Sequence, residues 1–176
     1  KGGGKGNVGV PAPASVPEFL VKLIGQKYAL DLQAAPYRGS APMMADMLGN
    51  QIPAGVGSVP DFIENHKAGK LRIVAVIGDK RQPILPDVPT FAELGITGLE
   101  ELPYYGLFAP AGTPQPVLDR FNQALARVVA MPEVREQLTA MGLTVSYQPQ
   151  AAFAARVKGY TQSWDRIIRT SGFTPK

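Results

Sequence analysis

Short β-rich runs alternate with amphipathic runs over much of this chain. The β-rich runs predict strands at 7–10, 30–37, 51–57, 72–77, 104–109 and 143–148. Between the first four of these, the spacing of apolar residues predicts helices at 16–28, 41–48 and 59–68. Strands that alternate with helices over short connections are typical of βαβ units. The pattern therefore predicts an α/β fold with a largely parallel sheet.

The last third of the chain is more strongly helical. Over 114–130, apolar residues recur every three or four positions and form one stripe, made of Val117, Leu118, Phe121, Leu125 and Val128. A second stripe in the last helix consists of Phe153, Val157, Tyr160, Trp164 and Ile167. The segment 78–103 is punctuated by Pro and Gly, with one short helix predicted at about 90–94. Such a segment is typical of a crossover between two lobes.

Three predicted helices begin with the same local pattern. The segments are SVPEF at Ser15, SAPMM at Ser40 and SVPDF at Ser58, each with Ser at the predicted N-cap and Pro in the first turn. SVPE also matches a capping box, in which Glu18 would reach back to the N-cap amide. In a parallel sheet the three helix N-termini would meet at the carboxyl edge, where α/β proteins bind ligands. Their amides favour a carboxylate or phosphate, although purely structural caps explain the pattern equally well.

Composition limits the possible functions. The chain has 176 residues, of which 45% are hydrophobic, enough for one core or two small lobes, and no apolar run approaches the length of a membrane span. The absence of Cys excludes structural disulfides and Cys-ligated metals. The net charge of +4 is spread along the chain, which disfavours nucleic acid as a partner.

Enzyme chemistry is difficult to assemble from these residues. His66 is the only histidine and is expected to be solvated near a helix end, and Asp61 and Glu64 are expected on an exposed helix face. No nucleophile–base set or general acid/base pair is recognisable. We therefore predict no catalytic residues, no metal site and no cofactor.

Four segments, taken together and in order, resemble a known family. They are APYRGSAPMMADMLGNQI, KAGKLRIVAV, LPDVPTFAELGI and YYGLFAPAGTPQPVLDRFNQAL. They resemble the substrate-binding receptors of tripartite tricarboxylate transporters, also called Bug proteins. The resemblance runs nearly ungapped from about residue 5 to the C-terminus. It implies an exported, periplasmic, two-lobed solute-binding protein that closes on a small carboxylate-bearing ligand and delivers it to membrane permease subunits without performing chemistry.

The resemblance also implies site residues. The family's Tyr-Lys-Gly-Ser turn is matched by Tyr37, Arg38, Gly39 and Ser40. Its Ser-x-Gly-x-Gly-Ser turn falls on 10–15, where only the final Ser matches and two alanines replace glycines. The predicted ligand-binding residues are Ser15, Tyr37, Gly39, Ser40, Ala41, Gly57, Ser58 and Tyr104.

Two departures from the family pattern affect the expected ligand and cleft. Pro53 stands where the family often has Asp, which favours a ligand without an amino group. Tyr104 stands where the family has Trp, and it has two alternative roles, lining the cleft or packing, of which packing is favoured.

The resemblance implies an incomplete first lobe, because family members carry additional residues at the N-terminus. Residues 1–103 would form the second lobe, and 104–176 would form only the C-terminal part of the first. Such a part exposes apolar surface unless a second chain or fragment covers it, so we expect a cleaved, truncated or incompletely represented protein, with the signal peptide outside this chain.

Two other classes of protein remain open at this point. One is the ligand-sensing effector domain of a transcription regulator, which would require a DNA-binding domain upstream. The other is a small α/β enzyme, which the single histidine disfavours.

Overall fold

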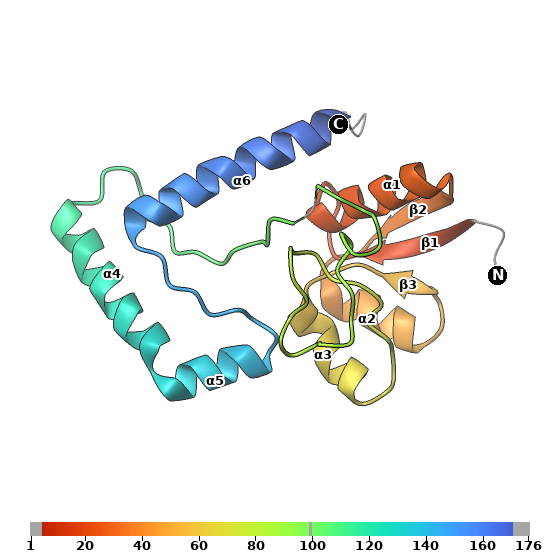
Figure 1. Cartoon of the computed structure of the whole chain (residues 1–176), viewed down its shortest axis with the longest axis horizontal. Coiled ribbons are helices and arrows are strands. Elements are labelled where there is room, and N and C mark those ends of the chain that lie inside the picture. The colour runs from red at the N-terminus through yellow and green to blue at the C-terminus, as the bar shows by residue number, and fades with distance from the viewer. Residues whose placement is uncertain (1–4, 99, 171–176) are drawn as a thin grey trace.

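Three parallel strands lie at the centre of the N-terminal part of the protein, in the order β2-β1-β3. The structure, a computed structural model, describes residues 5–98 and 100–170 (Figure 1). The strands are β1 (Lys5–Val10), β2 (Asp31–Pro36) and β3 (Ala54–Gly55). The predicted α/β fold with a parallel sheet is confirmed. The third strand is much shorter than the predicted run of 51–57.

Helices cover both faces of this sheet. They are α1 (Val16–Tyr28), α2 (Ser40–Leu48) and α3 (Val59–Lys67), close to the predicted ranges. The chain moves from β1 to β2 in one direction and from β2 past β1 to β3 in the other. Right-handed crossovers therefore place α1 on one face and α2 on the opposite face (Figure 1).

Glycines allow α2 to lie close to the strands. A Cβ atom on Gly9 would come within 2.6 Å of Ile52 Cδ1 and 2.8 Å of Met43 Cγ. A Cβ atom on Gly55 would lie 2.6 Å from Met47 Sδ. Met43 is fully buried and packs with Ile52 and Phe62, so the Met-rich run forms part of the core beneath α2.

The C-terminal helices extend away from the sheet and return to it. They are α4 (Gln115–Ala130), α5 (Pro132–Ala140) and α6 (Gln150–Thr170). Helix α6 runs back from the neighbourhood of α4 toward α1 (Figure 1). Near its C-terminal end Trp164 is buried against Phe19 of α1, with the two ring centroids 6.3 Å apart. No described helix combines the length and the hydrophobicity that crossing a bilayer would demand.

A series of aromatic contacts joins α6 to the segment that precedes α4. Tyr104 packs edge-on against both Phe153 and Tyr160 of α6, each with ring centroids 5.2 Å apart. Phe153 also contacts Phe108 at 5.7 Å. A Cβ atom on Gly106 would lie only 2.1 Å from Phe153 Cζ, so glycine at this position lets the ring approach without shifting.

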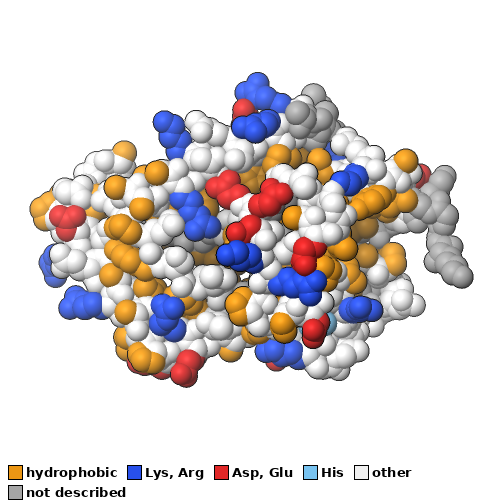
Figure 2. Space-filling model, viewed as in Figure 1, with side chains coloured by type: hydrophobic (Ala, Val, Ile, Leu, Met, Phe, Trp, Pro, Cys, Tyr) orange, Lys and Arg blue, Asp and Glu red, His pale blue; other side chains and the backbone are white. Residues whose placement is uncertain are grey.

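The part of the chain around α4 and α5 has little core of its own. Neither helix contributes a buried residue among those the structure describes. Phe121 of the predicted apolar stripe is 64% exposed, and Phe108 is 72% exposed. Figure 2 shows hydrophobic side chains at the surface over this side of the molecule. Helix α4 is therefore amphipathic, and within the described residues no further layer of structure covers its apolar stripe.

Several sequence predictions beyond residue 70 are wrong. The runs 72–77, 104–109 and 143–148 are not strands, apart from an isolated parallel bridge between Val76 and Thr90. A β-prone run becomes a strand only when a neighbour accepts its hydrogen bonds, and the described chain offers these runs no such neighbour. The predicted helix at 90–94 is a hydrogen-bonded turn, and α5 was not predicted although Pro132 at its first position and Glu133 signal a helix start.

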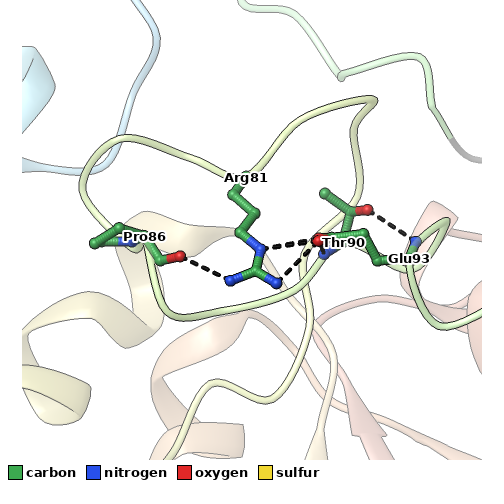
Figure 3. A network of polar contacts seen from close by, with 4 residues as sticks. All are labelled: Arg81, Pro86, Thr90 and Glu93. Atoms are coloured by element: carbon green, nitrogen blue, oxygen red, sulfur yellow. Dashed lines mark hydrogen bonds and ion pairs between the residues drawn. The ribbon is translucent and has the colours of Figure 1, made fainter.

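A polar network fixes the crossover between residues 78 and 98. The Thr90 N–H donates to the Glu93 carboxylate (2.7 Å), and the Glu93 N–H donates to the Thr90 hydroxyl (3.1 Å). The Arg81 guanidinium pairs with Glu93 (Nη2–Oε1 2.9 Å) and donates to the Pro86 carbonyl at 3.0 Å (Figure 3). Thr90 is 1% exposed, so the network secures a buried residue next to the bridge at Val76.

This network predicts an acid-sensitive contribution to stability. Hydrogen bonds from Arg81, and then from Thr90, hold the pKa of Glu93 below its usual value. Stability from a lowered carboxyl pKa is fully present above the pKa of an unfolded Glu, about 4.3, and is lost as the pH falls through the lowered pKa of the folded state. We expect Glu93→Gln to remove this component when the free energy of unfolding is measured by urea titration across acidic pH. Glu136→Gln, at an exposed position of α5, is the matched control. Identical acid profiles for wild type and Glu93→Gln would contradict the assignment.

Candidate functional site

The turns that follow the three strands are joined by backbone hydrogen bonds. The Tyr37 N–H donates to the Val10 carbonyl and the Gly39 N–H to the Pro11 carbonyl, both at 2.8 Å. On the other side of β1, the Val56 N–H donates to the Gly9 carbonyl at 2.8 Å. The helix N-termini of α1, α2 and α3 therefore lie at one edge of the sheet, and the strand order reverses between β1 and β3. The structure thus brings Ser15, Ser40 and Ser58 to the same carboxyl edge.

Two of the three serines are N-caps as predicted, Ser15 of α1 and Ser58 of α3, and Ser58 forms a capping box with Asp61. Ser15 is the N-cap of α1, but its hydroxyl donates backwards to the Ala12 carbonyl at 2.6 Å. The prediction that Ser40 is an N-cap is wrong, because Gly39 holds that position with φ 106°, which favours glycine. Ser58 is the N-cap of α3, and its hydroxyl donates to the Asp61 carboxylate at 2.5 Å.

Two of the three turns already hold a carboxylate of the chain itself. The Ala14 N–H donates to Glu18 Oε2 at 2.8 Å, whereas the predicted capping box would have used the Ser15 N–H. The Ser58 N–H donates to Asp61 at 3.2 Å. Asp61 is half-buried, so the expectation that it lies on an exposed helix face is wrong.

The turn between β2 and α2 differs from the other two. The first turn of α2 contains no acidic residue. Within the residues that the structure describes, no side chain caps this helix and no backbone acceptor lies against the N–H groups of Ser40 and Ala41. Both amides sit at the positive end of the helix, which favours an anionic oxygen. Arg38, which is exposed, is adjacent in sequence and adds positive charge.

Tyr37 holds this turn against α2. Its hydroxyl donates to Asp46 Oδ2 at 2.7 Å, and its ring packs on the cluster that contains Met43. The hydrogen bond to Asp46 is the main cause of a raised pKa of Tyr37, with smaller effects from burial and from the charge of Asp46.

The remaining predicted site residues have packing roles in the structure. A Cβ atom on Gly57 would lie 2.9 Å from Phe62 Cε2, so glycine lets this ring close under the turn. Tyr104 packs on α6, and the Arg156 guanidinium lies 5.9 Å from the Tyr104 ring centroid. These contacts favour the packing alternative for Tyr104.

Three further findings concern His66, metal-binding side chains and a cavity near α5. His66 is half-buried and its Nδ1 accepts from the Ile73 N–H at 3.3 Å, so the expectation that it is solvated is wrong. No cluster of metal-binding side chains occurs among the described residues. A cavity of about 210 Å³ lies between the crossover and the C-terminal end of α5, lined by Gln82, Pro83, Ile84, Arg135, Thr139, Gly142, Leu143, Thr144 and Val145.

Comparison with solved structures defines the class of protein. The R. palustris Rpa4515 structure with adipate matches with a TM-score of 0.86 and 26% identity, covering 97% of this chain and 57% of that chain. The periplasmic binding protein BugD matches with a TM-score of 0.79 and 28% identity, covering 94% of this chain and 56% of that one. MatC from Rhodopseudomonas palustris with bound malate matches with a TM-score of 0.72 and 27% identity, covering 93% and 54%. The fold is that of periplasmic binding proteins.

Sequence comparison defines the family. Residues 4–173 match the family described as "Tripartite tricarboxylate transporter family receptor", and the chain belongs to this family. A UPF0065 protein from the tcbD-tcbE intergenic region of Pseudomonas sp. (strain P51) is 33% identical over 147 residues, which is 83% of this chain and 44% of the relative. Protein BugT of Bordetella pertussis is 28% identical, over 92% of this chain and 49% of the relative. The chain therefore spans about half the length of the curated relatives it matches.

The bond between Tyr37 and Asp46 predicts a specific titration. Subtracting the alkaline absorbance titration of Tyr37→Phe from that of wild type should reveal a phenol that ionises above the usual pKa of about 10. Asp46→Asn should return this phenol toward its usual value, because the charged acceptor is gone. Stability from a raised pKa is present below the unfolded value and is lost as the pH rises through the raised one. Tyr105→Phe, which removes a phenol on a residue that is 74% exposed, is the control. A Tyr37 phenol that ionises at the usual pKa in wild type would refute the bond.

Proposed function

We propose that this chain forms about half of a periplasmic solute-binding receptor that captures a small carboxylate-bearing metabolite for a tripartite tricarboxylate-type transporter. Family membership supports this function, as do the related structures described with adipate and with bound malate. The observation that carries the proposal is the β2–α2 turn, whose first-turn amides have no acceptor in the described chain. The receptor binds its ligand, performs no chemistry on it and passes it to the membrane permease subunits.

The ligand carboxylate is proposed to bind at this turn. One oxygen accepts from the N–H groups of Ser40 and Ala41, and the Ser40 hydroxyl donates to the other. The Gly39 N–H is not available, because its bond to Pro11 fixes the turn in the shape that presents the next two amides. Ser15, Gly57 and Ser58 lie further along the same sheet edge, after β1 and β3, while Tyr37 keeps the turn in place from the α2 side.

We further propose that residues 1–103 form one lobe and that 104–176 contribute to another. The absence of buried side chains from α4 and α5, in the described structure, supports this division. A longer protein would supply a layer that covers the apolar stripe containing Phe121. The contact between Trp164 of α6 and Phe19 of α1 would then link the lobes. No observation on the described residues favours the regulator or enzyme alternatives.

Ligand binding at the β2–α2 turn can be tested by calorimetry and thermal melting with adipate, malate and monocarboxylates. A ligand at about 100 times its dissociation constant should stabilise the folded state by roughly 2.7 kcal/mol. Ser40→Ala should weaken binding by about tenfold, because a hydrogen bond to a charged group is lost. Ser146→Ala, at an exposed position outside the proposed site, is the matched control and should bind like wild type. If sugars or cations raise the melting temperature and no organic acid does, the proposed ligand class is wrong.

The lobe assignment predicts that one substitution has different effects in two contexts. Phe121→Ala should change the free energy of unfolding by less than about 0.5 kcal/mol in this chain, where the ring is exposed. In a longer form that includes the covering layer, the same substitution should cost about 3–5 kcal/mol, the usual loss for a buried Phe. Phe62→Ala, at a buried position, should be costly in both forms. Equal small effects of Phe121→Ala in both forms would overturn the assignment.

A further inference from the structure

Glu18 occupies the β1–α1 turn as an internal carboxylate. Its Oε2 accepts from the Ala14 N–H at 2.8 Å, and its Oε1 pairs with Lys22 Nζ at 3.3 Å. The Glu18 side chain is only 17% exposed, so it lies within the turn and not out in solvent. Ala14 has φ 50°, a left-handed conformation that is unusual for alanine. The turn is thus folded around the carboxylate of Glu18.

This arrangement places a negative charge beside the proposed ligand position. The β1–α1 turn is bonded directly to the β2–α2 turn through the Gly39 N–H and the Pro11 carbonyl. A ligand carboxylate held by Ser40 and Ala41 therefore lies next to the β1–α1 turn. In that turn the Ala14 N–H already donates to Glu18. Lys22 pairs with the other Glu18 oxygen, Oε1, but its side chain is 34% exposed, so solvent screens part of its positive charge. A second carboxylate at the same edge would meet repulsion without a free amide from Ala14 to compensate.

We infer that Glu18 is a specificity-determining residue that restricts this edge of the sheet to a single carboxylate of the ligand. The group that the ligand presents to the β1–α1 turn is neutral. Short dicarboxylates, whose two charged ends cannot separate, are disfavoured relative to monocarboxylates of the same length. This inference rests on the proposed function, because it concerns the same site.

The test compares succinate with butyrate, which have the same four-carbon length, by calorimetry on the longest form of the protein that carries this chain. Glu18→Gln removes the charge but keeps an oxygen that can accept from Ala14. Glu18→Ala also frees the amide. The ratio of succinate affinity to butyrate affinity should rise by about tenfold in Glu18→Ala and by less in Glu18→Gln, because only Glu18→Ala both removes the charge and frees the Ala14 amide. Glu64→Gln makes the same charge change at a side chain that is 78% exposed near the end of α3, and it should leave the ratio unchanged.

The outcomes separate this inference from the proposed function. If wild type binds neither these acids nor any other carboxylate in the panel, both fail. If wild type binds carboxylates but the ratio stays within about threefold of wild type in both Glu18 variants, the inference alone is overturned. A lower melting temperature without a change in the ratio would mean that Glu18 only stabilises the turn. Melting curves of each variant establish that it is folded before the ratio is compared.

Discussion

The geometry of the candidate site depends on three backbone hydrogen bonds at the carboxyl ends of the strands. They join Tyr37 to Val10, Gly39 to Pro11, and Val56 to Gly9. Each bond uses a main-chain group that parallel pairing would otherwise leave unsatisfied where a strand ends. Together they bring three helix N-termini to one edge of a small sheet. The Gly39 N–H is engaged in one of these bonds. The next two N–H groups, those of Ser40 and Ala41, are therefore the ones that have no acceptor in the described chain.

Local sequence signals predicted the N-terminal half of the fold well, because they depend on neighbouring residues. Proline in the first turn and apolar periodicity gave the limits of α1, α2 and α3 to within a residue. The runs at 104–109 and 143–148 failed because strand formation requires a partner that local pattern does not supply. At the site, the residue types correctly predicted that the three helix N-termini lie at the carboxyl edge of the sheet. They could not show that Gly39 takes the N-cap or that Glu18 bonds to Ala14, since backbone dihedrals and side-chain rotamers decide both.

The two halves of the chain differ in how they bury apolar surface. The N-terminal half packs its helices onto the sheet, aided by glycines that let Met43 and Met47 approach the strands. The C-terminal half relies on aromatic contacts along α6 and leaves the stripe of α4 exposed. This contrast agrees with a chain that spans about half the length of its relatives. The solved structures that it resembles are considerably longer, and this chain covers 57% of the Rpa4515 chain.

The central claim is that the amides at the start of α2 receive the ligand's carboxylate. The most direct measurement is an NMR titration: an organic acid that binds in the calorimetric panel is added to the ¹⁵N-labelled protein, and the amide chemical shifts are recorded. The account predicts that the resonances of Ser40 and Ala41 move furthest, downfield as expected for new hydrogen bonds to a carboxylate, while the Ala14 amide moves much less. If the largest shifts occur instead at residues lining the cavity near Arg135 and Thr139, and Ser40 and Ala41 do not shift, the central claim is contradicted.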